Sequence, residues 1–409
     1  MFFYLSIIFI MNGRFSNLVI DSDKSATDLL EFLIKKALDS RASDLHIDPL
    51  KDKIRLRLRV DGSLHEFPSL PLEKHQEIIS KIKILAGLRI DEHLKSQDGR
   101  FRLILQEGFV DIRVSVLPTY YGENAVLRLL SDQNESLNLE NLGFSGSDLQ
   151  KIRRAIVKPN GMILSTGPTG CGKTTALYAI LKTLNKSDVS IITIEEPIEY
   201  AIPGIRQIQV NAGSNLNFES GLRSILRQDP NIIMVGEIRD RETAVIAVNA
   251  ALTGHLLLST LHTNDAAATL PRLIQMGIEP FLLASTFSIA INQRLVKKLC
   301  DKCKEEEKVG VEQKSYLKNL FKKDVSRQKF WKSVGCDFCN GTGFLGRTII
   351  GEIMTTDEKI RSLILNKSSA SEIKKVAIKN GMQTLLQNGL EKVKTGVTSL
   401  EEVLRVAHE

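Results

Sequence analysis

A glycine-rich segment places the strongest constraint on how this chain folds. Residues 167–174 read GPTGCGKT, a spacing typical of loops whose backbone N–H groups cradle phosphates while the lysine reaches the β and γ oxygens. The apolar run before it, GMILST, predicts a buried strand, and the run after it, KTTALYAILKTLN, has the apolar spacing of a helix. Strand, loop and helix in this order predict a nucleotide-binding loop rather than a glycine-rich turn that binds nothing.

The predicted loop supplies ligands for phosphates and for Mg²⁺. We expect Lys173 to contact the phosphates of ATP and the hydroxyl of Thr174 to bind Mg²⁺. Cys171 occupies a variable position of the motif, where a small residue fits. The expected cofactor-binding residues are Gly167, Pro168, Thr169, Gly170, Cys171, Gly172, Lys173, Thr174 and Thr175.

The composition describes a globular chain of two or three domains. Of the 409 residues, 43% are hydrophobic and 25% are charged, which excludes a disordered tail. The net charge of +7 arises from 55 basic and 48 acidic side chains, so it permits an acidic or phosphate-bearing partner without requiring one.

The apolar start, MFFYLSIIFIM, is shorter than the roughly 17–25 residues that span a bilayer. We interpret it as an over-extended start, with Met11 the true first residue, or as a short membrane-surface or partner anchor.

Periodicity divides the rest of the chain. Residues 25–130 combine an amphipathic helix, TDLLEFLIKKALD, with period-two segments, and Asp61-Gly62 is a strong hairpin signal, so we expect a small α+β domain. Residues 144–295 alternate buried strand-like runs with helices, which predicts a parallel sheet flanked by helices, the α/β core of a P-loop NTPase. The other expected segments are an apolar or flexible extension (1–24), a linker (131–143), a tetracysteine module (296–355) and C-terminal helices (356–409).

Two apolar runs end in carboxylates that suit nucleotide hydrolysis. In NIIMVGE, Glu237 ends a predicted strand at the position of a Walker B carboxylate, although an acidic residue there can also cap the next helix. In ITIEEPIEY, Glu195 and Glu196 follow another strand. Because adjacent side chains point in different directions, at most one of them is expected to face the phosphates. We choose Glu195 as the base that activates water.

Two histidines flank the run LLLSTL. His255 and His262 lie seven residues apart, and an odd offset on a strand places side chains on opposite faces, so the two need not share one role. Either histidine can be a structural residue beside an apolar strand. Their position after the Walker B segment also permits a sensor role near the nucleotide.

Four of the five cysteines form two C-x-x-C pairs. Cys300 with Cys303, and Cys336 with Cys339, have the spacing of a tetrathiolate zinc site. Disulfides are disfavoured in a cytosolic chain, which strengthens the prediction of zinc. Four thiolates leave no open coordination position, so we expect this Zn²⁺ to be structural. Similar ribbons also occur in nucleic-acid-binding proteins.

These motifs together resemble the type II secretion and type IV pilus assembly ATPases of the GspE/PulE type. The resemblance covers the chain from about Ser25 to its end. It implies a RecA-like core, an N-terminal PAS-like α+β domain and a zinc module, in a homohexameric, Mg²⁺-dependent ATPase. Besides the phosphate loop and the ITIEEPIEY segment, the segments that carry it are SDLHIDP, RLRVDG, QDGRFRL, DIRVSVLPTYYGENAVLRLL, LRSILRQDPNIIMVGEIRDRETA, ALTGHLLLSTLHTNDA and GCDFCNGTGFLGR.

The resemblance also implies roles for individual side chains. Arg100 and Arg113 of the N-terminal domain would reach the γ-phosphate, and Arg223 with Arg227 would add positive charge. Without the resemblance, an arginine on a half-buried strand usually belongs to a solvated face. The acidic box of the family usually reads Glu-Asp, whereas this chain has Glu-Glu. The implied acidic box is Glu195 and Glu196, the Walker B carboxylate is Glu237, and the histidine box is His255 and His262.

Partners and location follow from the same resemblance. We expect a homohexamer that associates peripherally, from the cytoplasm, with a polytopic platform protein of the inner membrane. Extension is favoured over retraction because the zinc module resembles assembly motors, while secretion, a surface pilus and DNA uptake all stay open. A nucleic-acid-dependent translocase is the alternative, but aromatic residues make up only 6% and form no stacking array, so no direct nucleic acid is expected. A scaffold without turnover is disfavoured by Glu237.

Overall fold

A computed structural model describes residues 21, 23–105, 108–131, 138–310, 315, 317–319 and 328–407. The chain divides into two compact units, formed mainly by residues 1–135 and mainly by residues 136–333 with 346–409. Nearly all of the expected extension, and positions 132–137 of the expected linker, lie outside the described residues, so the domain boundaries stay predictions. None of the helices in the described ranges combines the length and apolar character that a membrane span requires.

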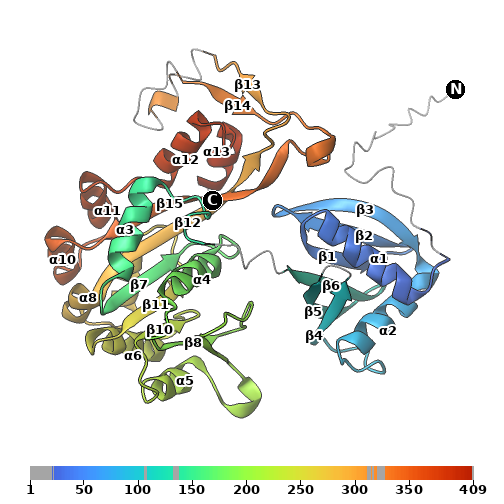
Figure 1. The fold of residues 1–409 in the computed structure, drawn as a ribbon, viewed down its shortest axis with the longest axis horizontal. Coiled ribbons are helices and arrows are strands. Elements are labelled where there is room, and N and C mark those ends of the chain that lie inside the picture. Colours follow the sequence, from blue (N-terminus) through green and yellow to red (C-terminus); the bar gives the residue numbers. More distant parts are fainter. Residues whose placement is uncertain are drawn as a thin grey trace. The chain divides into compact units, whose positions relative to one another are not determined.

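The first unit is an antiparallel sheet with helices packed against it (Figure 1). Its elements are α1 (Ala26–Asp39), β1 (Ala42–Pro49), β2 (Lys53–Val60), β3 (Ser63–Pro71), η1 (Leu72–Lys74), α2 (His75–Leu85), β4 (Gln97–Leu105), β5 (Gly108–Thr119) and β6 (Gly122–Ser131). The strand order is β3-β2-β1-β6-β5-β4. This arrangement confirms the expected α+β fold.

Local signals explain where elements of this unit begin and turn. The side chain of Ser25 accepts a hydrogen bond from the Asp28 N–H at 3.2 Å, which satisfies one of the free donors at the start of α1. Asp61 and Gly62 connect β2 to β3 with φ values of 49° and 87°. A two-residue hairpin turn of type I′ requires positive φ at both positions, so the Asp-Gly signal predicted this hairpin correctly.

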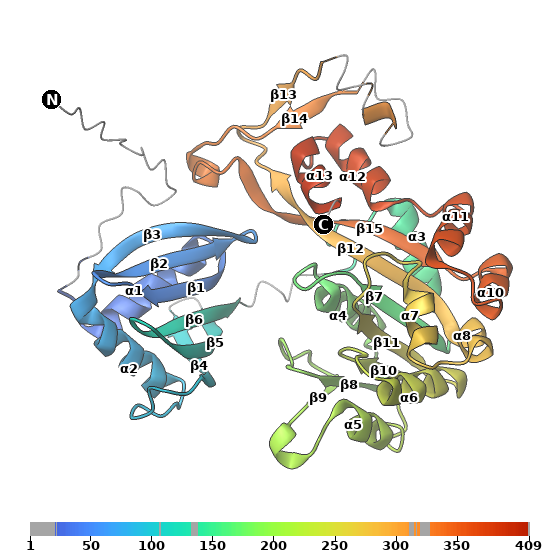
Figure 2. The ribbon, with the colours of Figure 1, turned by 180° about the vertical axis from the view of Figure 1, so that it is seen from behind.

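The second unit is built on a seven-stranded sheet (Figure 2). Its elements up to this sheet's edge are α3 (Gly146–Ile156), β7 (Gly161–Thr166), α4 (Lys173–Leu184), β8 (Ile191–Glu195), β9 (Arg206–Gln209), η3 (Ala212–Ser214), α5 (Phe218–Ile225), β10 (Ile232–Val235), α6 (Arg241–Leu252), β11 (Leu256–Leu261), α7 (Thr269–Gln275), α8 (Pro280–Thr286), β12 (Phe287–Leu299) and β15 (Phe344–Thr355). The strand order is β15-β12-β7-β11-β10-β8-β9. Strands β12, β7, β11, β10, β8 and β9 pair in parallel, as the alternating pattern predicted.

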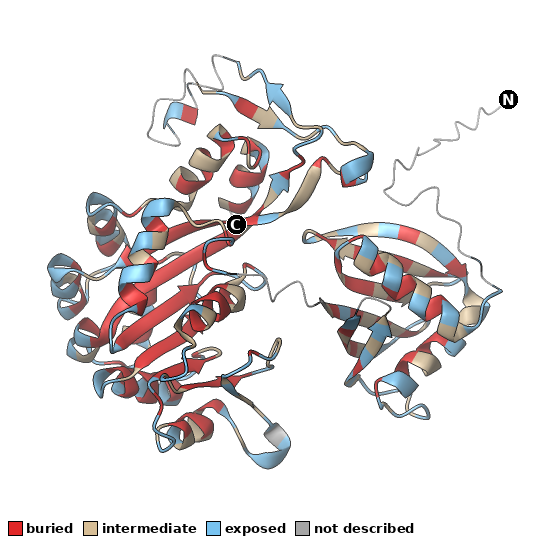
Figure 3. Cartoon of the chain, viewed as in Figure 1, coloured by how far each residue is buried: buried red, intermediate tan, exposed pale blue. Residues whose placement is uncertain are grey.

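Both faces of this sheet are covered, which explains why its strands read as continuous apolar runs. In β7, Met162 and Leu164 pack in the core that includes α6 and α8, whereas Ile163 packs on the opposite face with α4. Figure 3 shows the central strands as buried along their length. Because the strands are parallel, their carboxyl ends share one edge, and the loops that follow them meet there.

The remaining elements follow or flank the last strands of the sheet. They are β13 (Glu305–Glu307), β14 (Phe330–Lys332), η4 (Asp337–Cys339), α10 (Glu358–Leu365), α11 (Ala370–Lys379), α12 (Leu385–Lys394) and α13 (Leu400–Ala407). Helices α10 and α11 contribute to the core that contains α6, and α12 with α13 forms a separate small core with β12 and β14. The expected C-terminal helices are therefore present.

Candidate active site

The glycine-rich loop connects β7 to α4 in the predicted order. Gly167 has a φ of 134°, and an added Cβ would lie 2.7 Å from Cys171 Sγ and 2.8 Å from the Gln293 carbonyl oxygen. Only glycine fits this position without displacing its neighbours. Helix α4 begins at Lys173, so the free backbone N–H groups of its first turn point toward the loop.

Lys173 lies across this loop. Its ammonium donates hydrogen bonds of 2.9 Å to the carbonyl oxygens of Gly167 and Pro168, and its side chain is buried. Burial lowers the pKa of Lys173, while the thiol of Cys171 and the carboxylate of Glu237 act in the opposite direction. Cys171 is buried as well, and burial raises the pKa of its thiol.

A triplet of polar residues on β12 forms hydrogen bonds with the glycine-rich loop and with the end of β7. Asn292, Gln293 and Arg294 are buried although they belong to a long apolar strand. Asn292 donates to the Thr166 hydroxyl at 3.0 Å, and Gln293 donates to the Cys171 carbonyl at 2.9 Å. These bonds fix both ends of the segment that precedes α4. The sequence interpretation missed the triplet, although three polar residues inside an apolar run were a visible signal.

Glu237 lies at the carboxyl edge of the parallel sheet, next to two basic side chains. It follows β10, and its side chain is only 14% exposed. Arg239 Nη2 lies 2.5 Å from one of its oxygens, and His262 Nε2 lies 3.4 Å from the other. The same arginine reaches Glu196 Oε2 at 3.6 Å. The structure therefore brings Glu237, His262 and Glu196 together, with Arg239 as a bridging cation that the sequence interpretation did not single out.

Glu195 has different surroundings from its neighbour. Its carboxylate is buried and accepts hydrogen bonds from the Tyr178 and Thr193 hydroxyls and from Gln207 Nε2 at 3.2 Å. Burial raises the pKa of Glu195, although these three donors oppose the shift. The expectation that Glu195 and Glu196 face different ways is met. The residue chosen as base is the enclosed one, whereas the exposed Glu196 shares a cation with Glu237.

The two histidines lie at opposite ends of β11. His262 follows the strand at the carboxyl edge, and His255 precedes it, where its Nδ1 lies 2.9 Å from the Ala250 carbonyl oxygen. Six residues of strand separate the two by about 20 Å. Within one chain, therefore, the structure brings His262 and not His255 to Glu237. Length along the strand, rather than the face of the sheet, is the reason.

The loop after His262 is held by an ion network. Asp265 accepts the Ala268 N–H at 2.7 Å and the Lys374 ammonium at 3.1 Å, while Glu352 accepts the Ala266 N–H at 3.0 Å. Lys374 also lies 3.5 Å from Glu352, which is 1% exposed. Burial raises the pKa of Glu352. Burial alone would lower the pKa of Lys374, but the two carboxylates outweigh it and keep it raised. Strand β15 and helix α11 thus fix the loop that carries His262.

The arginines expected at the site lie on surfaces of the two units. Arg223 pairs with Glu219 at 3.0 Å on α5, and Arg227 donates to the Arg223 carbonyl at 2.9 Å. In the described part of the chain, both arginines thus contact residues close to them in the sequence. In the first unit, Arg100 and Arg113 stand directly opposite each other on β4 and β5.

A row of arginines continues across the sheet of the first unit. Arg113 also stands opposite Arg128 on β6, and Arg128 donates to Asp44 at 2.9 Å. Like charges directly opposite each other on neighbouring strands are unfavourable. Because Arg100, Arg113 and Arg128 occupy successive positions of one row, this face has an excess of positive charge that suits an anionic ligand.

The four paired cysteines come together in space. The sulfur atoms of Cys300, Cys303, Cys336 and Cys339 all lie within 4.8 Å of one another. The two sulfurs of the second pair are 3.7 Å apart, and Cys339 Sγ accepts the Gly343 N–H at 3.1 Å. No disulfide joins these cysteines. The cluster has the donor set of a tetrathiolate metal site.

Comparison with known proteins decides the family. The model of the family described as Type II/IV secretion system protein matches residues 20–405. The chain belongs to this family. The resemblance inferred from the sequence motifs is thereby confirmed, and the family includes proteins named as ATPases of secretion and pilus systems.

Several members of the family are similar along most of this chain. A type IV pilus assembly ATPase PilB of Thermus thermophilus is 45% identical over 384 residues, which cover 93% of this chain and 43% of that protein. The type II secretion system protein HxcR of Pseudomonas aeruginosa is 44% identical, with 93% of this chain and 77% of that protein covered. The type II secretion system ATPase E of Vibrio cholerae is 42% identical, with 95% and 76% covered. The chain thus spans less than half of its Thermus relative.

Solved structures confirm the fold of this family member. The ATPase DotB of Legionella pneumophila superposes with a TM-score of 0.70 at 22% identity, over 95% of this chain and 97% of that one. The pilus retraction motor PilT superposes with a TM-score of 0.61 at 26% identity, over 91% and 95%.

Proposed function

We propose that this chain hydrolyses ATP and uses the energy to assemble a type II secretion pseudopilus or a type IV pilus. The observation that carries the proposal is the convergence of Lys173, Glu237 and His262 at the carboxyl edge of the parallel sheet. The names of its relatives, pilus assembly ATPase and type II secretion ATPase, support the same activity and favour extension over retraction.

ATP and Mg²⁺ fit the residues at this edge. The loop from Gly167 to Thr175 would hold the phosphates, because its glycines leave the backbone N–H groups accessible. Thr174 and Glu237 supply the hydroxyl and carboxylate oxygens that Mg²⁺ prefers, and the ion would neutralise charge on the phosphates. Glu195 is the proposed base, since a buried carboxylate with a raised pKa holds a proton from water more tightly. We leave His255 out of the proposed site.

The cysteine cluster is proposed to hold a structural Zn²⁺. A tetrahedral site with Zn–S bonds of about 2.3 Å places neighbouring sulfurs about 3.8 Å apart. The separation of 3.7 Å between Cys336 and Cys339 supports this assignment.

We further propose that the protein works as a homohexamer at the cytoplasmic face of the inner membrane. Arg100 and Arg113 would complete the γ-phosphate site, with Arg223 and Arg227 adding positive charge, because the arginine row of the first unit has an excess of positive charge. A polytopic platform protein of the membrane is the proposed partner, and the association is peripheral. The support comes from the relatives named in secretion and pilus assembly.

The test compares two substitutions at the loop and at the carboxyl edge. Lys173→Ala removes a ground-state contact and should weaken ATP binding at least tenfold. Glu237→Gln keeps the shape of the side chain, so it should bind ATP normally but lower turnover by 100-fold or more. Nucleotide binding and phosphate release are measured on both. Glu242→Gln, an exposed glutamate on α6, is the matched control. Normal turnover by Glu237→Gln would refute the assignment.

A further inference from the structure

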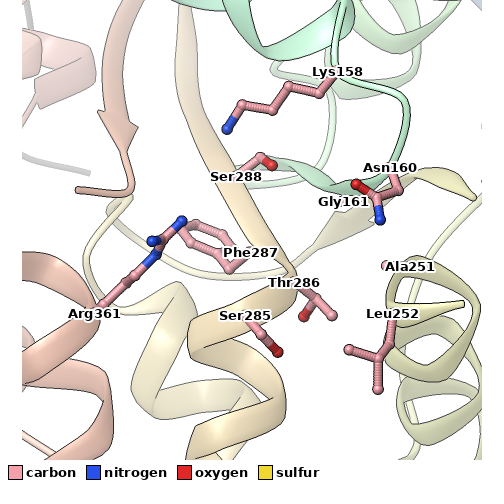
Figure 4. Close-up of a pocket in the computed structure, with 10 residues that line it drawn as sticks. All are labelled: Lys158, Asn160, Gly161, Ala251, Leu252, Ser285, Thr286, Phe287, Ser288 and Arg361. Atoms are coloured by element: carbon pink, nitrogen blue, oxygen red, sulfur yellow. The ribbon is translucent and has the colours of Figure 1, made fainter. Parts of the chain in front are cut away.

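A small polar pocket lies at the edge of the seven-stranded sheet opposite the nucleotide loop. Its volume is about 170 Å³, and it opens where β7 and β12 begin and where α6 and α8 end (Figure 4). Gly161 forms part of its wall at the start of β7, whereas the nucleotide loop follows Thr166 at the other end of that strand. The pocket is therefore separate from the proposed site of ATP.

Two cations and no carboxylate line this pocket among the described residues. Lys158 follows α3 and Arg361 belongs to α10, so distant segments of the chain contribute the two charges. No described residue forms an ion pair or hydrogen bond with the Lys158 side chain. Arg361 pairs with Glu358 at 2.7 Å, but that glutamate is 87% exposed, and such a solvent-exposed pair on a helix surface contributes little to stability. Both cations are thus available to a ligand at little cost.

Neutral donors lie beside the cations. Ser288 is only 7% exposed, and its hydroxyl, which has no partner among the described residues, faces the pocket. Figure 4 shows the Lys158 ammonium near Ser288 and the Arg361 guanidinium beside the Phe287 ring. Asn160 adds a side-chain amide to the lining. A Cβ at Gly161 would lie 2.5 Å from the Ser288 oxygen, so glycine is needed to leave this hydroxyl accessible.

The cations are not required to cap the two helices that end here. A helix C-terminus presents free carbonyl groups, which basic side chains often satisfy. In α8, the hydroxyls of Ser285 and Thr286 donate to the Leu282 carbonyl, each at 2.8 Å. At the end of α6, the Ala250 carbonyl accepts from His255 at 2.9 Å. The carbonyl groups at these helix ends are therefore already hydrogen-bonded. The positive charge of the pocket is not needed to cap the two helices.

We propose that this pocket binds a phosphate monoester or inorganic phosphate. Two charge-assisted donors, a hydroxyl and an amide match the several oxygens of one dianionic group. The pocket volume of about 170 Å³ is several times the roughly 30 Å³ that one water molecule occupies in the liquid, so the pocket has room for a group the size of phosphate. It is too small for ligands whose sites need roughly 300 Å³ or more. The monoester can be free in solution or belong to the headgroup of a lipid such as phosphatidic acid.

Calorimetry on the full chain tests the proposal. Inorganic phosphate is titrated into protein whose nucleotide loop is saturated with Mg²⁺ and a non-hydrolysable ATP analogue, which also fills the γ-phosphate position, and into Lys173→Ala, so that binding at the loop does not contribute. Wild type should bind phosphate in both settings. Lys158→Gln and Arg361→Gln should each weaken binding at least tenfold, and Ser288→Ala a few-fold. Arg154→Gln is the matched control, because this exposed arginine on α3 does not line the pocket.

A second arm distinguishes the two sources of the ligand. Phosphatidylcholine vesicles with and without phosphatidic acid are sedimented with the same variants. Co-sedimentation that requires phosphatidic acid, Lys158 and Arg361 assigns the ligand to a membrane lipid, and phosphate binding without co-sedimentation assigns it to solution. Equal phosphate binding by wild type and Lys158→Gln, or none by wild type at concentrations of tens of millimolar, would overturn the proposal.

Discussion

At the scale of single residues, the surroundings of each carboxylate decide what it can do. Glu237 is partly exposed and shares its oxygens between Arg239 and His262. Glu195 is enclosed by three donors, and burial raises its pKa. Burial of Glu195 makes its ionisation costly and raises its affinity for a proton. Under the proposed function, the two carboxylates would serve different steps of ATP hydrolysis.

The raised pKa of Glu195 predicts how stability changes with pH. A carboxyl group whose pKa is higher in the folded state contributes stability below its unfolded pKa, and this contribution is lost as the pH rises through the folded pKa. Glu195→Gln cannot ionise, so wild type should lose stability relative to this variant as the pH rises above the ordinary glutamate pKa of about 4.5. Urea unfolding at a series of pH values measures the difference. Glu196→Gln, at an exposed position, is the control, and a difference that stays constant with pH would contradict the expectation.

Residue types and their spacing predicted which side chains belong to the candidate site more reliably than they predicted the positions of those side chains in space. Lys173 and Glu237 were predictable because a motif fixes their distance from a strand end. The placement of His255 and His262 at opposite ends of β11 was also predictable, because they flank the run that forms this strand. Arg239 was missed, since one arginine after a strand carries no signal until its partners are placed.

At the scale of elements, the sheet joins the site to the C-terminal helices. Glu352 on β15 and Lys374 on α11 hold the loop after His262. Removing one member of a buried ion network leaves an uncompensated buried charge. This lowers the stability of the fold more than replacing the whole network by apolar residues would. The contacts between these elements could not be read from sequence, because 86 residues separate Glu352 from the N–H group that it accepts.

Lys374→Met tests this connection. We expect a loss of about 3 kcal/mol in the free energy of unfolding, because two carboxylates lose their cation. Turnover should fall while ATP affinity stays near normal, since His262 and not the phosphate loop is displaced. Denaturant unfolding and steady-state kinetics give both quantities. Adding Glu352→Gln should recover part of the stability, and Lys375→Met, at an exposed neighbour, should change neither. Equal effects of Lys374→Met and Lys375→Met would exclude the role.

The cysteine cluster makes a separate prediction. Cys303→Ser should lower zinc content to well below one ion per chain and expose residues near β13 and β14 to proteases, while the parallel sheet stays folded. Metal analysis and limited proteolysis measure these changes. Cys171→Ser, which alters the one cysteine outside the cluster, should retain zinc. Cleanly folded wild-type protein without zinc would refute the site.

At the scale of the whole molecule, activity should depend on arginines from the first unit. Arg113→Ala is expected to bind ATP and form rings, but to lower turnover at least 1,000-fold, because an arginine at the γ-phosphate is worth about 10³–10⁵ in rate. Arg102→Ala is the control, since Arg102 is paired with Asp111 at 2.7 Å. Turnover is followed as Arg113→Ala is mixed with wild type. A strictly linear decline would contradict cooperation within a ring, and full activity of the pure variant would remove this role.

One strand contributes to all three proposed ligand sites or lies next to them. β12 begins beside Ser288 at the small pocket, supports the nucleotide loop through Gln293, and ends at Leu299, next to Cys300 of the cysteine cluster. If phosphate and ATP both bind along this strand, their affinities can be coupled through it. Thermodynamic reciprocity then sets a measurable equality: the factor by which phosphate changes the affinity for ATP must equal the factor by which ATP changes the affinity for phosphate.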